Sequence, residues 1–110
     1  MTEITLFYKG KKLTGIESKG HTDFSDSGTD IICAAVSVLM QSLAFGLSEI
    51  ARLPGLVINI DDSVPLMKIT WPEKYSEKIS LLARTTAESL KIIADDNSGY
   101  VKIKTEEIKQ

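Results

Sequence analysis

A run of mostly apolar, strand-forming residues near the start of the chain, followed by a polar segment, predicts a β-hairpin. The residues from Ile4 to Tyr8 are rich in strand-forming types. The polar segment that follows, residues 9–12, contains a glycine suited to a tight turn. A second arm runs from about Lys12 to Lys19 and ends at Gly20. We therefore expect two paired strands that bring Gly20 and the residue after it to one end of a sheet.

The stretch from residue 31 to residue 48 has no charged residue and predicts a buried helix. We expect this helix to run from about Ile31 to Arg52, because Leu53-Pro54-Gly55 is a helix-ending sequence. Polar or small residues interrupt the stretch too often for a membrane span, namely Ser37, Gln41, Ser42, Gly46 and Ser48. Its apolar surface is larger than a small sheet covers, so either a second helix or a second subunit packs against it.

The second half of the chain repeats this succession of patterns. Residues 56–60 and 64–71 flank the acidic turn Asp61-Asp62-Ser63 and predict a second hairpin. Apolar residues at helical spacing predict a helix from about Glu73 to Asp95. Inward-facing and outward-facing types of residue alternate from Val101 to Thr105, which predicts a final half-buried strand. After Thr105 we expect a loosely held tail.

The resulting order of elements, ββαββαβ, predicts an α+β fold. In this fold two layers form, with the helices packed on one face of a largely antiparallel sheet. The chain of 110 residues is long enough for one such core, so we expect a single domain over residues 1–110. One cysteine permits no internal disulfide, and the sequence from Met1 to Ile4 does not begin an export signal. We expect a cytoplasmic protein.

The charge of the chain disfavours a nucleic-acid-binding function. Thirteen Lys and Arg residues against fifteen Asp and Glu residues give a net charge of −2. The strong positive field that non-specific nucleic-acid binding requires is therefore missing. Three carboxylates, Asp23, Asp26 and Asp30, would favour a basic protein substrate, although the charge of a solvated loop is the simpler explanation for them.

The only histidine and the only cysteine, His21 and Cys33, are twelve positions apart on either side of a polar segment. A cysteine attacks as the thiolate, which the start of a helix favours. If Asp30 is the N-cap, Cys33 is the third helical residue, near amides able to bind an oxyanion. His21 is the one imidazole able to take the thiol proton and return it to a leaving amine. A buried cysteine and a surface histidine without catalytic roles remain the alternative.

The same segment resembles the signature of the bacterial ribosomal-processing cysteine protease family, Prp. The matching residues are Gly20-His21, then Gly28, then Asp30-Ile31-Ile32-Cys33-Ala34-Ala35-Val36-Ser37. The family pattern is Gly-His-Ala, a short loop with a glycine, and Asp-Ile-Val-Cys-Ala-Ala-Val-Ser. Here Thr22 stands in place of alanine, Phe24 in place of tyrosine and Ile32 in place of valine. None of these differences removes a reactive group.

This resemblance implies a homodimeric cysteine endopeptidase. Its substrate would be the precursor of large-subunit ribosomal protein twenty-seven, from which it removes a short N-terminal extension ending in aromatic residues. Cys33 would be the nucleophile and His21 the general base and acid, with Asp30 and Ser37 supporting the site. The segment between them would act as a lid over the substrate, and the residues we assign to this substrate loop are Thr22, Asp23, Phe24 and Gly28.

Other functions predict different properties. A non-catalytic dimeric module that binds a ribosomal protein or an assembly intermediate would keep its activity after the substitution Cys33→Ser. One cysteine, one histidine and scattered aspartates lack the ligand spacing of a zinc site. A thiol redox function lacks a resolving cysteine. We therefore expect neither a metal nor a cofactor.

Overall fold

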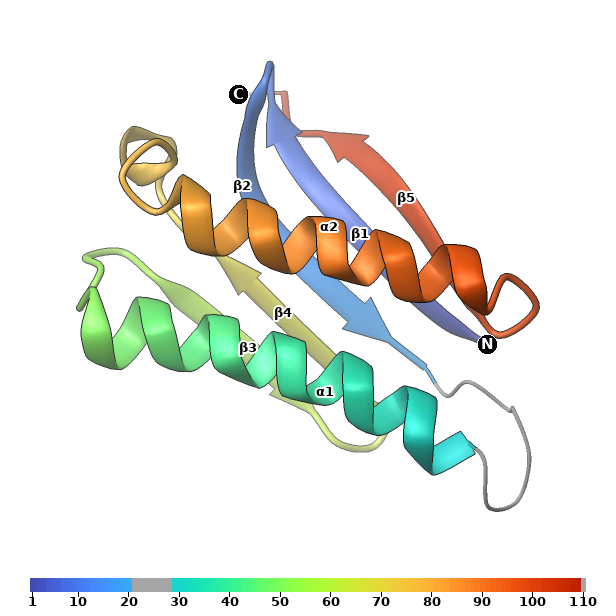
Figure 1. Cartoon of the computed structure of the whole chain (residues 1–110). Coiled ribbons are helices and arrows are strands. Elements are labelled where there is room, and N and C mark those ends of the chain that lie inside the picture. The colour runs from blue at the N-terminus through green and yellow to red at the C-terminus, as the bar shows by residue number, and fades with distance from the viewer. Residues whose placement is uncertain (21–28, 110) are drawn as a thin grey trace.

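The structure is a computed structural model that describes residues 1–20 and 29–109, with the side chains of residues 29 and 30 excluded. Two helices and five strands follow one another in the predicted order (Figure 1). Their bounds are β1 Thr2–Lys9, β2 Lys12–Lys19, α1 Thr29–Phe45, β3 Val57–Asp61, β4 Leu66–Thr70, α2 Ser80–Asp96 and β5 Val101–Glu107.

The five strands form one sheet in the order β3-β4-β2-β1-β5. Three of the four strand pairs are antiparallel, and only β1 and β5 run parallel. Both helices lie on the same face of this sheet, with α1 over the β3–β4 side and α2 over the β1–β2–β5 side (Figure 1). The predicted α+β fold, with its helices on one face of a largely antiparallel sheet, is confirmed.

The hydrophobic core fills the space between the sheet and the helices. Successive strand residues point to opposite faces, so Ile4 and Leu6 face the helices while Phe7 faces the other side. Phe7 is nevertheless buried, and the Nζ atom of Lys68 lies 4.6 Å from its ring centre. The fully buried side chains of the core are Ile4, Leu6, Ile16, Met40, Leu43, Leu47, Ile69, Leu90 and Val101.

Helix α1 differs from its prediction at both ends. It begins at Thr29, two residues before the expected start, and continues into a π-helical turn, Gly46–Ile50. Arg52 has a φ of 50°, a left-handed conformation that ends the helical backbone. By length and composition alone, the stretch Ile31–Ile50 would suffice to cross a membrane. Core helices of water-soluble proteins meet the same criterion, so this is weak evidence for a membrane segment.

The second predicted helix is shorter than expected. Residues Glu73–Tyr75 form a separate 3₁₀ turn, and α2 starts only at Ser80. The segment before α2 is held against β2, because Trp71 Nε1 and Ser76 Oγ both donate hydrogen bonds to the carbonyl oxygen of Leu13, at 3.0 and 2.9 Å. The apolar positions that suggested helix before Ser80 are buried by this anchored turn instead.

The prediction of a loose tail after Thr105 is wrong. Strand β5 continues to Glu107, and the N–H of Ile108 donates to the carbonyl oxygen of Tyr8 at 2.7 Å. The Glu107 carboxylate accepts a hydrogen bond from the N–H of Gly10 at 2.8 Å. The tail is ordered because the free edge of β1 offers it backbone partners.

Candidate active site

A cavity of about 600 Å³ lies beside the first half of α1, and Cys33 lines it. The opposite wall comes from the ends of β2 and β4 and from the turn between β3 and β4. Its volume is within the range typical of ligand-binding pockets. The described residues that line it are Thr2, Ser18, Gly20, Cys33, Val36, Ser37, Met40, Gln41, Ile60, Asp62, Pro65, Leu66 and Met67.

Helix α1 presents two kinds of side chain to this cavity. Cys33, Ser37 and Gln41 follow one another at intervals of four residues, so they share one face of the helix. Cys33 is half-buried, whereas Ser37 and Gln41 are exposed. Val36 and Met40 on the adjoining face are buried and belong to the core. The cavity therefore has a row of polar groups beside an apolar floor.

The position of Cys33 in α1 differs from the prediction. Thr29 and Asp30 already have helical backbone, so Asp30 is not the N-cap, and Cys33 is the fifth helical residue instead of the third. In an α-helix the N–H of Cys33 pairs with the carbonyl of Thr29. The amides free to bind an anion are those of the preceding turn. Helical side chains lean toward the N-terminus, so the Cys33 side chain extends in the direction of those amides.

Gly20 fixes the direction in which the chain leaves β2. Its N–H donates to the carbonyl oxygen of Pro65 at 2.8 Å, and its own carbonyl accepts from Thr2 Oγ1 at 3.3 Å. Its φ is +95°, and a Cβ atom there would lie 2.6 Å from the carbonyl oxygen of Met1. Only glycine tolerates both conditions. Gly20 therefore fixes the backbone at the last described residue before His21.

The structure brings together two of the predicted site residues, because Cys33 and Ser37 line one cavity. Asp30 is described only by its backbone, which is helical. The remaining predicted site residues lie outside the described residues, namely His21, Thr22, Asp23, Phe24 and Gly28. Their roles, and the pairing of His21 with Cys33, stay predictions.

Other lining residues were not foreseen from the sequence. Gln41 lies two helical turns after Cys33, so helical spacing alone was sufficient to find it. Met67 and Asp62 are about thirty residues further along the chain, and only the sheet order brings them to the cavity. Within the described ranges, no three His, Cys, Asp or Glu side chains gather closely enough to hold a metal ion.

The turn between β3 and β4 has an internal hydrogen-bond pair. The Asp61 carboxylate accepts from the Ser63 N–H at 3.0 Å and from Ser63 Oγ at 2.6 Å. The bond from the Ser63 hydroxyl is the main reason why the pKa of Asp61 lies below its ordinary value, followed by the bond from the Ser63 N–H. The turn therefore has a defined shape at the wall of the cavity.

Comparison with known proteins identifies the family. The family model described as Cysteine protease Prp matches residues 1–102. The chain belongs to the cysteine protease Prp family. The predicted resemblance to Prp and the predicted class of enzyme, a cysteine protease, are both confirmed. Among curated proteins, no similar sequence is found.

Solved structures of similar proteins share the fold. SMU.848 from Streptococcus mutans is 27% identical, with a TM-score of 0.85 over 98% of this chain and 96% of that one. The essential ribosomal processing protease Prp of S. aureus, in complex with a covalently linked product peptide, is 21% identical with a TM-score of 0.81. The same protease with a substrate peptide is 20% identical with a TM-score of 0.80. Both cover 96% of this chain and 100% of the other.

Proposed function

We propose that this protein is a cytoplasmic cysteine endopeptidase that removes the short N-terminal extension of large-subunit ribosomal protein twenty-seven during ribosome assembly. Membership of the Prp family supports the protease class, and the S. aureus protein of this fold is a ribosomal processing protease. One observation carries the proposal for this chain. Its single cysteine, Cys33, lines a cavity whose volume is sufficient for a peptide segment.

Cys33 is the nucleophile in this proposal. A cysteine protease requires a thiolate, and the chain contains one cysteine. His21 takes the proton of the thiol as the sulfur attacks the scissile carbonyl carbon. The proton then passes to the departing amine as the C–N bond breaks, leaving a thioester. Water, deprotonated by His21, hydrolyses the thioester and releases the carboxylate product and the free thiol.

The start of α1 supports the charge that develops on the carbonyl oxygen. The first N–H groups of an α-helix have no partners within the helix, and the side chain of Cys33, one turn after Thr29, extends toward them. These amides are therefore the proposed oxyanion donors, in place of the N–H of Cys33 itself. Ser37, one turn after Cys33 on the same face, and Asp30 are proposed to support the site. Thr22, Asp23, Phe24 and Gly28 form the proposed substrate loop.

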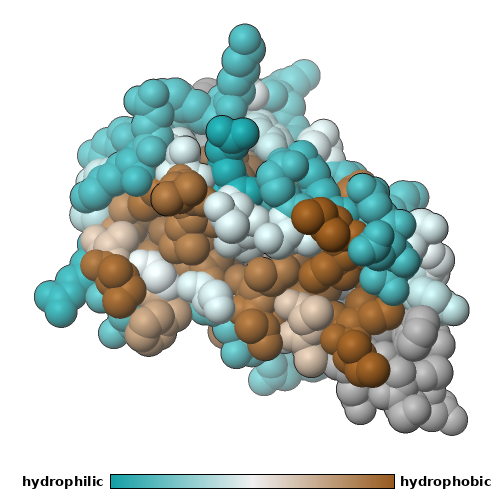
Figure 2. Space-filling view, in the orientation of Figure 1, coloured by the Kyte–Doolittle hydropathy of each residue, from teal (hydrophilic) through white to brown (hydrophobic). Residues whose placement is uncertain are grey.

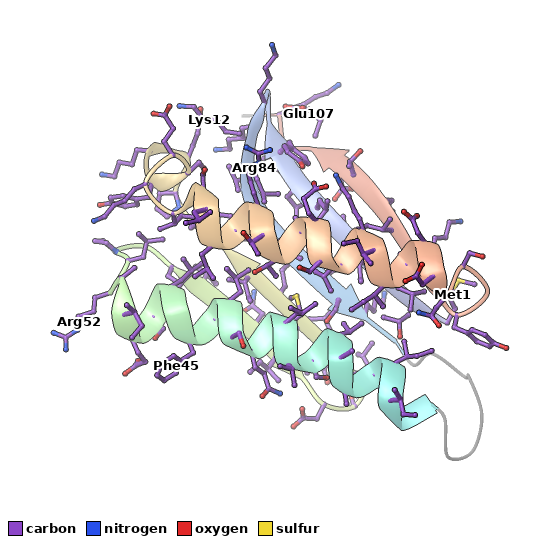
Figure 3. The ribbon with its side chains drawn as sticks, viewed as in Figure 1. Met1, Lys12, Phe45, Arg52, Arg84 and Glu107 are labelled. Atoms are coloured by element: carbon purple, nitrogen blue, oxygen red, sulfur yellow. The ribbon has the colours of Figure 1, made fainter. Side chains whose placement is uncertain are left out.

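We propose that the active form is a homodimer. The solvent-exposed side of α1 and of the π-helical turn that follows it carries four large apolar side chains, with relative exposures between 60% and 74%, namely Ile31, Val38, Phe45 and Ile50. Figure 2 shows apolar side chains gathered over the part of the molecule formed by α1, and in Figure 3 Phe45 projects outward from α1 on the side away from α2. An exposed apolar face of this kind is typical of a subunit interface.

The decisive experiment compares the parent protein with Cys33→Ser on a peptide that spans the extension junction of its own ribosomal protein. We expect the parent to cut a single bond, as read by mass spectrometry, and Cys33→Ser and His21→Ala to leave the peptide intact. Ser98→Ala is the control, because Ser98 is exposed and does not line the cavity.

Two results would contradict this proposal. Full activity of Cys33→Ser would exclude Cys33 as the nucleophile. Saturable binding of the peptide by the parent and by Cys33→Ser, without cleavage by either, would favour the alternative of a non-catalytic module that binds a ribosomal protein or an assembly intermediate.

A further inference from the structure

The cavity beside Cys33 contains a single charged side chain among its described lining residues, Asp62. All the other lining residues are apolar or neutral polar residues. No described Lys or Arg forms an ion pair with Asp62, whereas Lys12 pairs with Glu73, Lys91 with Glu88 and Lys104 with Glu3. An unpaired carboxylate at the wall of a cavity attracts a cationic group of whatever binds there.

The backbone around Asp62 is held on both sides. On one side, Asp61 accepts the two hydrogen bonds from Ser63 that shape the turn. On the other side, the carbonyl of Pro65 accepts the hydrogen bond from Gly20, which joins the turn to the end of β2. Asp62 lies between these two attachments. The backbone that carries its carboxylate therefore belongs to a fixed wall of the cavity, which lowers the cost of ordering this segment when a ligand binds.

The rest of the cavity is suited to an apolar side chain. Val36 and Met40 from α1 and Leu66 and Met67 from β4 line it. Val36 and Met40 are buried, so the apolar surface open to a bound group comes from the half-buried Met67 and from Ile60, which pairs with it and is 63% exposed. The cavity thus places a negative charge beside an apolar surface, and the complementary peptide has a Lys or Arg close to an apolar side chain.

We propose that Asp62 is a specificity-determining residue of this protease, which pairs with a lysine or arginine of the substrate while an apolar substrate side chain lies against Ile60 and Met67. This inference rests on the proposed protease function. It adds one property of the substrate, a positive charge next to the apolar side chain that enters the cavity. Asp62 acts on substrate selection and takes no part in bond cleavage.

The expected size of the effect follows from the exposure of Asp62. Asp62 is an exposed residue, and ion pairs between exposed groups change an equilibrium by roughly two- to five-fold. We expect the preference for lysine over an uncharged residue at the paired position to have this size in kcat/KM. The preference decreases as the salt concentration rises, because salt screens exposed charges.

The test uses a set of otherwise uncharged junction peptides in which one lysine occupies, in turn, each of the four positions on either side of the cut bond. Norleucine, which has a similar shape and no charge, replaces lysine in the reference peptide. We expect the parent protein to cleave one or two of the lysine peptides two- to five-fold faster than the reference, and Asp62→Asn to cleave them all at the rate of the reference.

Two further variants separate a local pairing from a general effect of charge. Glu77→Gln removes the same charge from a residue that lines a separate cavity with Lys11 and Lys12, and we expect it to keep the lysine preference of the parent. Asp62→Lys should reverse the preference and favour a glutamate at the paired position. Peptide affinities measured in the Cys33→Ser background should show the same pattern, which tests selection without any contribution from catalysis.

The outcomes distinguish failure of this inference from failure of the proposed function. If the parent cleaves every peptide at one rate, or if Asp62→Asn keeps the lysine preference, the inference is overturned and the protease function stands. If the parent cleaves none of the peptides, the proposed function fails. In that case a lysine preference in binding that disappears in Asp62→Asn still supports the pairing.

Discussion

Gly20 connects the start of the chain, the β3–β4 turn and the segment that carries His21. Its N–H, its carbonyl and its α-carbon each contact a different residue, namely Pro65, Thr2 and Met1. A Gly-His pair at the end of a strand was recognisable in the sequence as part of a motif. The physical reason for the glycine was not, because it depends on contacts with residues eighteen or more positions away along the chain.

The substitution Gly20→Ala should destabilise the protein and reduce cleavage. A side chain at a φ of +95° is strained, and the new Cβ would lie 2.6 Å from the Met1 carbonyl oxygen. We expect a loss of about 1–3 kcal/mol in the free energy of unfolding, measured by urea denaturation. Gly10→Ala is the matched control, because Gly10 also has a positive φ but nothing within 4 Å of its Cβ position. Equal losses in both variants would exclude the contact with Met1 as a cause.

Asp61 should titrate below its ordinary range. The hydrogen bonds from Ser63 favour the charged form, so the pKa is lowered in the folded state. The contribution of these bonds to folding is complete above the ordinary carboxyl pKa and is lost as the pH falls through the lowered value. We expect the NMR titration of Asp61 to shift upward in Ser63→Ala. An unchanged titration midpoint would contradict the assignment to Ser63.

The helices illustrate how far local patterns determine an element. The uncharged stretch from residue 31 predicted the existence and most of the length of α1, because apolar periodicity reflects which faces are buried. It did not predict the start, since Thr29 and Asp30 are both good capping residues and only the backbone shows that both are helical. The start of α2 was missed because Leu13, in another element, anchors the preceding turn.

This anchor can be tested by Ser76→Ala. Ser76 is buried and donates to the carbonyl of Leu13, which also accepts from Trp71, so the variant leaves that carbonyl with one partner. We expect a loss of about 0.5–1.5 kcal/mol in the free energy of unfolding, measured by urea denaturation. Ser98→Ala, at an exposed serine, should have almost no effect. A larger loss in Ser98→Ala than in Ser76→Ala would contradict the importance of this bond.

The molecule as a whole follows the sequence-based prediction in its order of elements and in the placement of both helices on one face. Hairpins and helices come from local periodicity, which a single sequence contains. Local periodicity does not predict which residues line the cavity, because Cys33 and Met67 come together only through the packing of α1 on β4. The same argument explains why Asp62 was interpreted as part of an ordinary turn.

The proposed homodimer makes a prediction about the outer side of α1. Replacing Val38 or Phe45 by lysine places a charge on the exposed apolar face, and burying it without a partner would be costly. We expect the parent to sediment as a dimer in analytical ultracentrifugation and both variants to sediment as monomers. Leu81→Lys, at an exposed leucine of α2, is the control and should leave the parent's state unchanged. A monomeric parent would contradict the homodimer.

Parallel pairing of β1 with β5 links the order of synthesis to the order of folding. Strand β1 leaves the ribosome first, but one of its edges has no partner until Val101–Glu107 follow it. Because Thr2 pairs with Val101, the last contacts of the sheet connect residues almost a full chain apart, and such distant contacts slow folding. Until then, the nascent chain exposes an open strand edge on which other unfinished chains can assemble. The protease therefore completes its sheet only when its last strand has emerged.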